Sequence, residues 1–249
     1  MAAIRPALLA VTAACALVGL APAPAAALSL PDSCTIMVTA EHRDCWLTSF
    51  ARCDVEGTTE GAAELREISY TGEGVEEMHR YDGDGQWLEA WFVDDDERAW
   101  LVGTPEARFS NTALGAGERV RYAFEMVNDW RGIVRRNRST STVEGWVVLT
   151  GEEQTVDGEV LLEARMHETV TEAGETHPFE VFDAQALFLA DAGVMLFGQV
   201  RLEEDGEIFD EDWSPLRLHR PGDARFGAER ASLGCSEDGT RAALEEVGQ

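Results

Sequence analysis

The sequence contains no lysine: all 20 basic residues are arginine, and they face 47 aspartates and glutamates. Without a lysine amine, the chain cannot form a lysine Schiff base or use a serine–lysine dyad. The formal net charge is −27. This charge argues against general binding to nucleic acid or to anionic membrane surfaces, because both would repel the protein.

The common catalytic motifs are also missing. The sequence has no G-x-S-x-G elbow, no H-E-x-x-H zinc motif, no phosphate-binding P-loop and no dinucleotide-binding glycine fingerprint. His167 precedes a glutamate but has no second histidine four residues later, so we interpret it as an exposed residue on the polar face of a strand. We therefore assign no catalytic residue, no metal and no cofactor, and expect a binding protein rather than an enzyme.

A long apolar run occurs only at the N-terminus. Arg5 is followed by apolar residues 7–20 and by a small-residue site at 25–27. This order predicts a signal peptide over residues 1–27 and a mature chain over 28–249. No later run approaches the roughly 18 apolar residues that a membrane-spanning helix needs. We expect a periplasmic or secreted protein with no integral membrane segment after cleavage.

Cys15 lies inside this segment and offers lipidation as an alternative. A lipoprotein signal favours an aliphatic residue three positions earlier, where this chain has Thr12. The residues after Cys15 stay apolar, as in the middle of a signal core. We therefore favour an unmodified mature N-terminus at Leu28.

Four cysteines follow the predicted cleavage site: Cys34, Cys45, Cys53 and, far along the chain, Cys235. An even number in an exported chain predicts two disulfides, with the connectivity open. Any full pairing must join Cys235 to one of the other three. A metal site is the alternative, because His42 lies three residues before Cys45, but this spacing fits no familiar zinc pattern.

The rest of the sequence alternates between apolar and polar residues, with glycine and aspartate turns. Residues 120–126 and 160–166 show the period of two that is typical of half-buried strands. Further strand candidates are 35–39, 64–70, 75–81, 86–93, 97–103, 143–150, 179–190, 194–202 and 213–219. We expect 143–150 to pair with 159–166 across a loop at 151–158. Helix is scarce, with candidates only at 240–247 and in part of 42–52.

About ten strands without βαβ alternation, linkers or repeats predict an all-β fold. We expect one disulfide-tied domain, built as a single antiparallel meander that curls into an open or closed barrel with little helix. Residues 179–190 and 194–202 are apolar on both faces. One face would line the interior, and the other must be covered or must bind something.

The turn Asp82-Gly83-Asp84-Gly85 resembles the start of a calcium loop. It lacks a third ligand, and Val93 stands where such a loop has its glutamate. Two Asp-Gly pairs before an apolar strand are typical of a hairpin turn. We interpret the segment as a turn and leave weak calcium binding open here and at 94–96.

Two groups of residues are candidates for ligand binding. The only basic cluster, Arg131, Arg135, Arg136 and Arg138, could receive an anionic group, although pairing with nearby carboxylates is the alternative. Trp87 and Trp91 share one face of a predicted strand and could stack on a sugar. Core packing is the commoner use of such aromatic residues.

Two functions remain as expectations. The first is a non-enzymatic envelope protein that binds a partner protein or an amphipathic, lipid-like ligand. The second is a hydrolase of envelope polysaccharide that uses Trp87, Trp91 and nearby carboxylates. A cleft with two carboxylates about 5–10 Å apart beside exposed tryptophans would favour the hydrolase, whereas a closed apolar cavity would favour binding.

Overall fold

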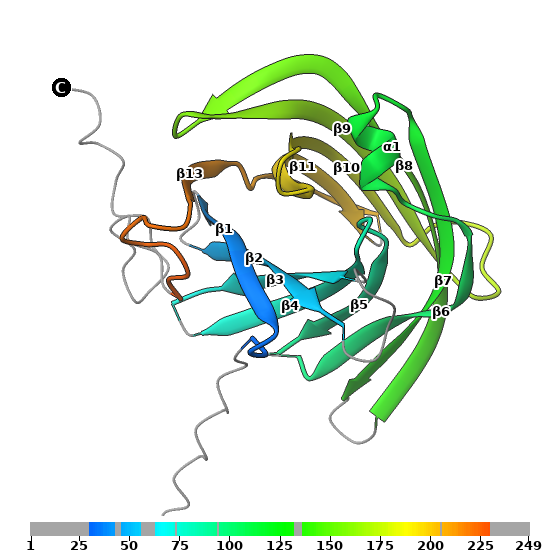
Figure 1. The fold of residues 1–249 in the computed structure, drawn as a ribbon. Coiled ribbons are helices and arrows are strands. Elements are labelled where there is room, and N and C mark those ends of the chain that lie inside the picture. Colours follow the sequence, from blue (N-terminus) through cyan, green and yellow to red (C-terminus); the bar gives the residue numbers. More distant parts are fainter. Residues whose placement is uncertain are drawn as a thin grey trace, which may run out of the picture.

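The computed structural model describes residues 30–42, 46–55, 63–72, 74–93, 95–131, 136–204 and 206–229. The predicted signal peptide, Cys45, Cys235 and the predicted helix at 240–247 lie outside these ranges. Within them the chain forms one curled antiparallel sheet with a single short helix (Figure 1). The predicted all-β meander is confirmed, and the curled sheet is not closed into a complete barrel.

The sheet has 13 strands, and twelve of them follow one another in chain order. Their bounds are β1 Cys34–His42, β2 Leu47–Asp54, β3 Ala63–Tyr70, β4 Val75–Asp82, β5 Trp87–Phe92, β6 Glu97–Ala107, β7 Val120–Arg131, β8 Arg136–Val156, β9 Glu159–Glu172, β10 Glu180–Leu189, β11 Val194–Glu204, β12 Glu207–Asp212 and β13 Pro215–His219. The helix α1 spans Asn111–Gly115 between β6 and β7. No helix in the described part of the chain has the length and apolar character to cross a membrane.

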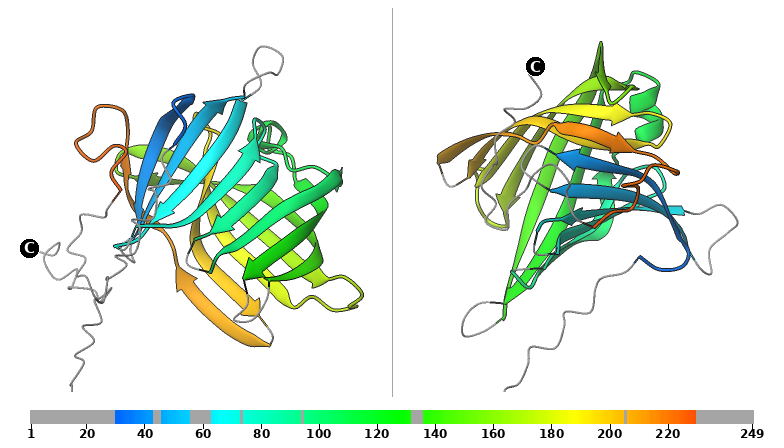
Figure 2. Two further views of the ribbon diagram at one scale, coloured as in Figure 1. Left: turned by 90° about the horizontal axis from the view of Figure 1, so that it is seen from below. Right: turned by 90° about the vertical axis from the view of Figure 1, so that its left-hand side faces the viewer.

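The two edges of the sheet are formed by one continuous stretch of chain. β12 pairs with β11 as far as Asp212, and the backbone N–H of Trp213 still donates to Gly198 O at 2.8 Å. The chain then bends, and Pro215 begins the pairing of β13 with β1 at His42. Because β12 and β13 follow one another directly, the sheet must curl until its ends lie close together, as Figure 2 shows.

Near their shared turn, β10 and β11 are largely buried on both faces, which explains the two-sided apolar sequence there. Ala186 and Phe188 pack in a cluster with Leu114 of α1. Leu187 and its neighbours on the opposite face pack with Val38 and Phe50 of β1 and β2. Residues from opposite halves of the sheet therefore form the main core, and near the turn the second face of these strands is covered by protein.

The outer face of β1–β3 is also covered. The backbone N–H of Gly227 donates to Thr39 Oγ1 at 3.0 Å. Ala228 packs against the buried side chains of Leu47, Ile68 and Tyr70. The segment that follows β13 thus returns across the first strands and shields them from water.

Two local predictions need correction. The described residues of 42–52 are not helical, because β1 reaches His42 and Leu47–Asp54 pairs with strands on both sides. The predicted loop at 151–158 is wrong: β8 continues to Val156 past an irregularity between Leu149 and Glu153. The turn is only Asp157-Gly158, and both residues have positive φ (51° and 86°), as a tight hairpin turn requires.

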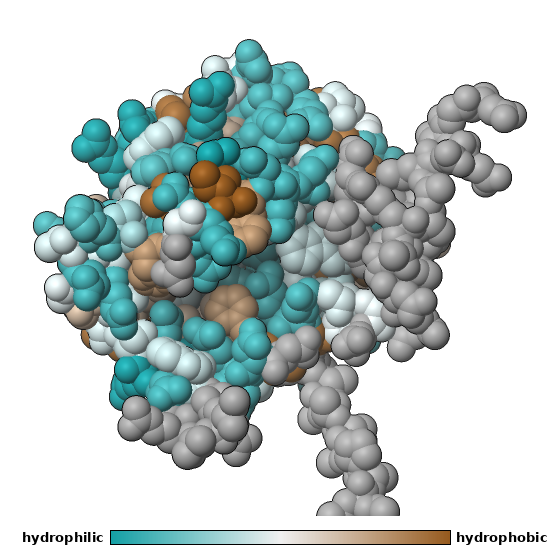
Figure 3. Space-filling model, turned by 180° about the vertical axis from the view of Figure 1, so that it is seen from behind, coloured by the Kyte–Doolittle hydropathy of each residue, from teal (hydrophilic) through white to brown (hydrophobic). Residues whose placement is uncertain are grey.

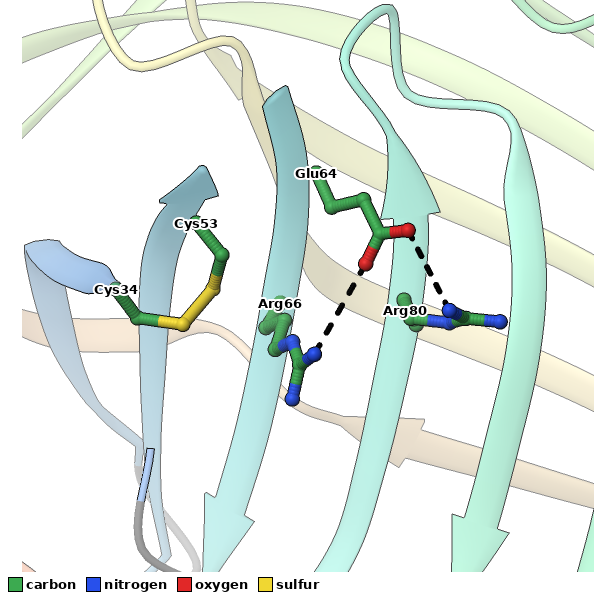
Figure 4. The surroundings of a disulfide bond; sticks show 5 residues. All are labelled: Cys34, Cys53, Glu64, Arg66 and Arg80. Carbon is green, nitrogen blue, oxygen red and sulfur yellow. Dashed lines mark hydrogen bonds and ion pairs between the residues drawn. A yellow bond between two sulfur atoms is a disulfide. The ribbon is translucent and has the colours of Figure 1, made fainter. Parts of the chain in front are cut away.

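A disulfide joins Cys34 and Cys53, which are directly paired residues of β1 and β2. Figure 4 shows this bond beside Glu64, which lies between Arg66 and Arg80 at 3.9 and 3.4 Å. The prediction that these cysteines form disulfides is confirmed for this pair. It also removes Cys34 and Cys53 as partners of Cys235.

We predict that the second disulfide joins Cys45 to Cys235. Ala228 packs against Leu47, two residues after Cys45. Cys235 follows Glu229, the last described residue, by six positions, and an extended chain of that length reaches about 20 Å. Non-reducing peptide mapping is expected to recover a Cys45–Cys235 linked peptide. Free thiols at both positions in freshly isolated oxidised protein would contradict this pairing.

Candidate functional site: an interior cavity

The curled sheet surrounds a cavity of about 620 Å³. Residues of β2–β11 line it, together with connections at both ends of the strands. Seen from behind, the space-filling view shows a hollow with apolar residues inside a largely polar rim (Figure 3). The cavity has the size and mixed lining that are typical of sites for small organic ligands.

Hydrogen bonds between side chains and backbone groups join three connections of the sheet at one end of the cavity. Asn111 Nδ2 donates to Gly193 O at 2.7 Å, which joins α1 to the β10–β11 turn. Gln86 is 1% exposed, and its Oε1 accepts from the Phe109 N–H at 2.8 Å. Gly85 has φ of +90°, and a Cβ there would lie 2.4 Å from Asn111 Nδ2. This glycine permits the close packing of α1 at this end.

Aromatic rings form much of the cavity wall. Trp87 stacks on Phe124 with ring centroids 5.5 Å apart, and Phe109 meets Tyr122 edge-on at 5.8 Å. The aromatic residues that line the cavity are Phe50, Tyr81, Trp87, Phe92, Phe109, Tyr122, Phe124, Phe179 and Phe197. Packed rings of this kind offer a large apolar surface and negative ring faces to a ligand.

Glu168 of β9 points into this wall. Tyr122 donates its hydroxyl to Glu168 Oε2 at 2.8 Å. Burial among apolar groups, with a smaller contribution from the charge of Glu180, raises the pKa of Glu168 to about 7, against the opposing effects of the Tyr122 hydrogen bond and of His167. Near neutral pH this carboxyl is therefore poised between its protonated and ionised forms.

Gly145 of β8 makes the position of Tyr122 possible. The two residues are paired across β7 and β8, and a Cβ at Gly145 would lie 2.4 Å from Tyr122 Cζ and 2.8 Å from His167 O. The tyrosine ring therefore covers a glycine, which brings its hydroxyl within reach of Glu168.

Gly145→Ala is therefore expected to displace the Tyr122 ring and to lower the free energy of unfolding by about 1–3 kcal/mol, the usual range for overpacking. Urea denaturation measures this loss. Gly72→Ala is the matched control, because a Cβ at Gly72 meets nothing within 4 Å. Equal stability of the two variants would contradict the close packing of Tyr122 on Gly145.

A second polar network joins the neighbouring strands β3 and β4 on the cavity wall. Tyr81 donates to Glu67 Oε2 at 2.7 Å, and His79 Nε2 lies 3.3 Å from Glu77 Oε2. Burial raises the pKa of Glu67, although the nearby His79 opposes this. Burial also opposes the charged form of His79, but its hydrogen bond to Glu77 and the charge of Glu67 raise the pKa of the imidazole overall. The histidine is thus held between two carboxyls.

The two networks meet inside the cavity. Burial raises the pKa of Tyr81 well above 10, and the charges of Glu67 and Glu168 both add to this increase. The carboxyls of Glu67 and Glu168 therefore both lie near the Tyr81 hydroxyl, although β3 and β9 are far apart in the strand order of the sheet. The cavity brings together acidic groups that are 101 positions apart in the sequence.

The end of the cavity opposite α1 is acidic. Successive turns of a meander alternate between the two ends of its strands, so the turns after β5, β9 and β11 lie at this end. Glu180 and Glu204 are directly paired there; burial raises the pKa of Glu180, and so does the charge of Glu204. Burial and the neighbouring Asp95 raise the pKa of Glu97. All four residues line the cavity.

The two predicted tryptophans lie on opposite faces of the sheet, so the expectation that they share one face is wrong. Tyr81 pairs with Trp87 and Arg80 pairs with Glu89, which leaves Leu88 as an extra residue in β5. This bulge shifts the alternation. Trp87 lines the interior cavity, whereas Trp91 is 37% exposed in an outer depression beside Arg66, Arg80 and Arg98.

The predicted arginine cluster lies at the β7–β8 hairpin. Arg131 and Arg136 are a backbone pair at its tip, and Arg135 lies outside the described residues. Arg138 is exposed, and its guanidinium carbon is 5.0 Å from the centre of the Trp100 ring. Anion binding by this cluster stays a prediction, and Arg138 contacts an aromatic ring of its own sheet.

The Asp82–Asp84 turn uses its carboxylates within the protein. Asp82 Oδ1 accepts from the N–H groups of Asp84 and Gln86 at 3.0 and 2.9 Å. Asp84 Oδ1 accepts from Thr112 N and Oγ1 at 2.9 and 2.7 Å. Within the described ranges, no group of three or more His, Cys, Asp or Glu residues is arranged to hold a metal ion. These contacts attach the β4–β5 turn to the start of α1.

Other polar candidates lie outside the cavity. His167 Nδ1 lies 2.8 Å from Asp183 Oδ1, and its ring stacks on Trp146. His42 Nδ1 lies 2.7 Å from Trp213 O, where the chain passes from β12 to β13.

Of the residues that line the cavity, the sequence pointed only to Trp87 as a candidate for contact with an organic ligand. Glu168 follows His167 directly and continues the apolar face of Met166, which is the signal that could have identified it.

Comparison with known proteins identifies no relative of this chain. No family model matches it, and neither a curated protein nor a solved structure matches it. A function for this protein therefore has to be inferred from the chemistry of its own cavity residues.

Proposed function

We propose that this protein is an exported binding protein that holds a small amphipathic ligand inside the curled sheet. The observation that carries this proposal is the cavity of about 620 Å³, with aromatic walls and a few converging polar groups. Ligand sites commonly have volumes of about 300–1,000 Å³ and this kind of lining.

Two further observations support the proposal. The Cys34–Cys53 disulfide fits an oxidising compartment, as the predicted signal peptide does. The polar groups of the cavity are held in place by hydrogen bonds, which supports a site formed before the ligand binds. Core packing near their shared turn explains most of the two-sided apolar sequence of β10 and β11, while Met195 and Phe197 of β11 line the cavity.

Mass spectrometry of small molecules that co-purify with the exported protein tests this function. We expect one small molecule per chain, with an apolar body. Recovery of a tightly bound partner protein, with no small molecule, would instead support the partner-binding form of the original hypothesis.

A hydrolase is the second candidate, and Glu168 favours it. A carboxyl with a pKa of about 7 could act as a general acid, and Glu67 and Trp87 line the same cavity. Trp91, however, lies on the outer surface and cannot stack on a substrate held inside. Release of soluble fragments from purified envelope polysaccharide, abolished in Glu168→Gln, would support this candidate over simple binding.

A further inference from the structure

The charged residues that line the cavity are strongly biased toward one sign. Six of the lining residues are acidic: Glu67, Asp95, Glu97, Glu168, Glu180 and Glu204. No arginine is among the described lining residues, and the chain has no lysine. His79 is the one lining residue that can carry a positive charge, and it is held between Glu67 and Glu77.

We infer that the ligand is an amphiphile with a cationic amine head, which pairs with the carboxylate of Glu168 while its apolar body lies against the aromatic wall. This inference rests on the proposed binding function and specifies its ligand class. A fatty acid or phospholipid headgroup would bring a negative charge into a cavity that offers no arginine to receive it.

The geometry around Glu168 suits an ammonium group. Tyr122 donates to Oε2 of the carboxyl at 2.8 Å, so the lone pairs of Oε1 remain as acceptors for a second donor. The rings of Tyr122, Phe109 and Phe124 adjoin one another in the same wall, and their faces attract cations. An ammonium beside Glu168 would also remove the cost of holding that carboxylate in apolar surroundings.

The acidic end of the cavity carries the same negative charge as the carboxylate of Glu168. Glu97, Glu180 and Glu204 lie where the cavity meets the turns opposite α1, and the whole protein carries a net charge of −27. A negative potential in this part of the cavity attracts cationic ligands and repels anionic ones.

Displacement of a bound fluorophore distinguishes the head groups. Phenylnaphthylamine, a neutral apolar dye, is bound first and is then displaced by dodecylammonium, dodecanol or dodecanoate, each below its micelle concentration. These competitors share one chain length and differ in head-group charge. We expect dodecylammonium to displace the dye at a concentration at least about tenfold lower than dodecanoate, because one lost ion pair with a buried carboxylate commonly exceeds a tenfold change.

Matched variants locate the effect. Glu168→Gln is expected to weaken dodecylammonium about tenfold and to leave dodecanol unchanged, whereas Glu125→Gln, at an exposed position on β7, changes neither. Two results would overturn the inference while the binding function stands. One is that dodecanoate displaces the dye as well as dodecylammonium does, and the other is that Glu168→Gln leaves the affinity for dodecylammonium unchanged. A dye that does not bind to the wild-type protein at all would overturn both.

Discussion

Replacing Glu168 with Gln is expected to stabilise the folded protein above pH 7, by about 3 kcal/mol. The pKa of Glu168 is about 7 in the folded state, against an ordinary value of 4.5 for a glutamate. Each unit of difference corresponds to about 1.4 kcal/mol between the two protonation states. The glutamine keeps an oxygen that can accept from Tyr122 but never carries the buried charge.

The sign of the pH dependence follows from proton binding. Below pH 4.5 the carboxyl is protonated in both states, and Glu168 costs the fold nothing. As the pH rises from 4.5 to 7, the unfolded chain loses its proton first, so the folded state is progressively destabilised. The full cost is present above pH 7. Tyr122, Glu180 and His167 are the titratable groups that shift the pKa of Glu168, and Tyr81 also lies close enough to interact with its charge.

Urea denaturation at pH 5 and pH 8 measures this effect. The stability difference between Glu168→Gln and the wild type is expected to grow with pH, while Glu125→Gln on the outer face of β7 follows the wild type. A constant difference across this range would show that Glu168 has an ordinary pKa. The result would also weaken the hydrolase candidate, because its general acid would then be ionised at neutral pH.

Glu41→Leu is expected to lower the free energy of unfolding by about 3 kcal/mol. Glu41 is 0% exposed, and His219 Nε2 lies 3.3 Å from its Oε2. The two side chains bridge β1 and β13, the pairing that brings the last strand back onto the first. Removing one partner leaves the other as an unpaired polar group in a buried place, which commonly costs about 3–5 kcal/mol for ion pairs.

A double variant separates pairing from packing. Glu41→Leu combined with His219→Phe removes both partners of this contact, so it should recover part of the lost stability. Arg217→Gln, at an exposed position on β13, is the control for substitution in the same strand. Equal losses in the single and double variants would show that the contact between Glu41 and His219 is not what stabilises this pairing.

The strands were largely predictable because their side chains alternate with a period of two. The alternation over 120–126 and 160–166 corresponds to β7 and β9, and the strand candidates 179–190 and 194–202 correspond to β10 and β11. The long-range closure was not predictable in the same way. The bend at Trp213, between the pairing with β11 and the pairing with β1, depends on residues about 170 positions away.

The bulges explain most of what sequence reasoning missed. Leu88 has no partner in β4, so Trp87 turns inward and Trp91 outward, although simple alternation places them together. The strand β8 passes through Gly151, where φ is +85°, before it reaches its turn. A bulge depends on the register of the neighbouring strand, and that register is not visible within one segment.

The cavity was hidden for a different reason. Among 47 acidic residues, no pattern marks Glu67 and Glu168 as interior. Their burial follows from the curl of the sheet, which brings β3 and β9 to the same space. Only the alternation through Met166, Glu168 and Val170 was available, and it places a glutamate on an otherwise apolar face.

A dye titration with matched variants tests the central claim, that the interior cavity binds a small amphipathic ligand, most directly. Ala99 is 4% exposed and lines the cavity, whereas Val160 is 54% exposed and lies outside it. We expect phenylnaphthylamine to bind the wild type and Val160→Phe with equal affinity, and Ala99→Phe at least about tenfold more weakly because the new ring occupies the cavity. Circular dichroism confirms that each variant is folded. Equal dye affinity in a folded Ala99→Phe variant would contradict the claim.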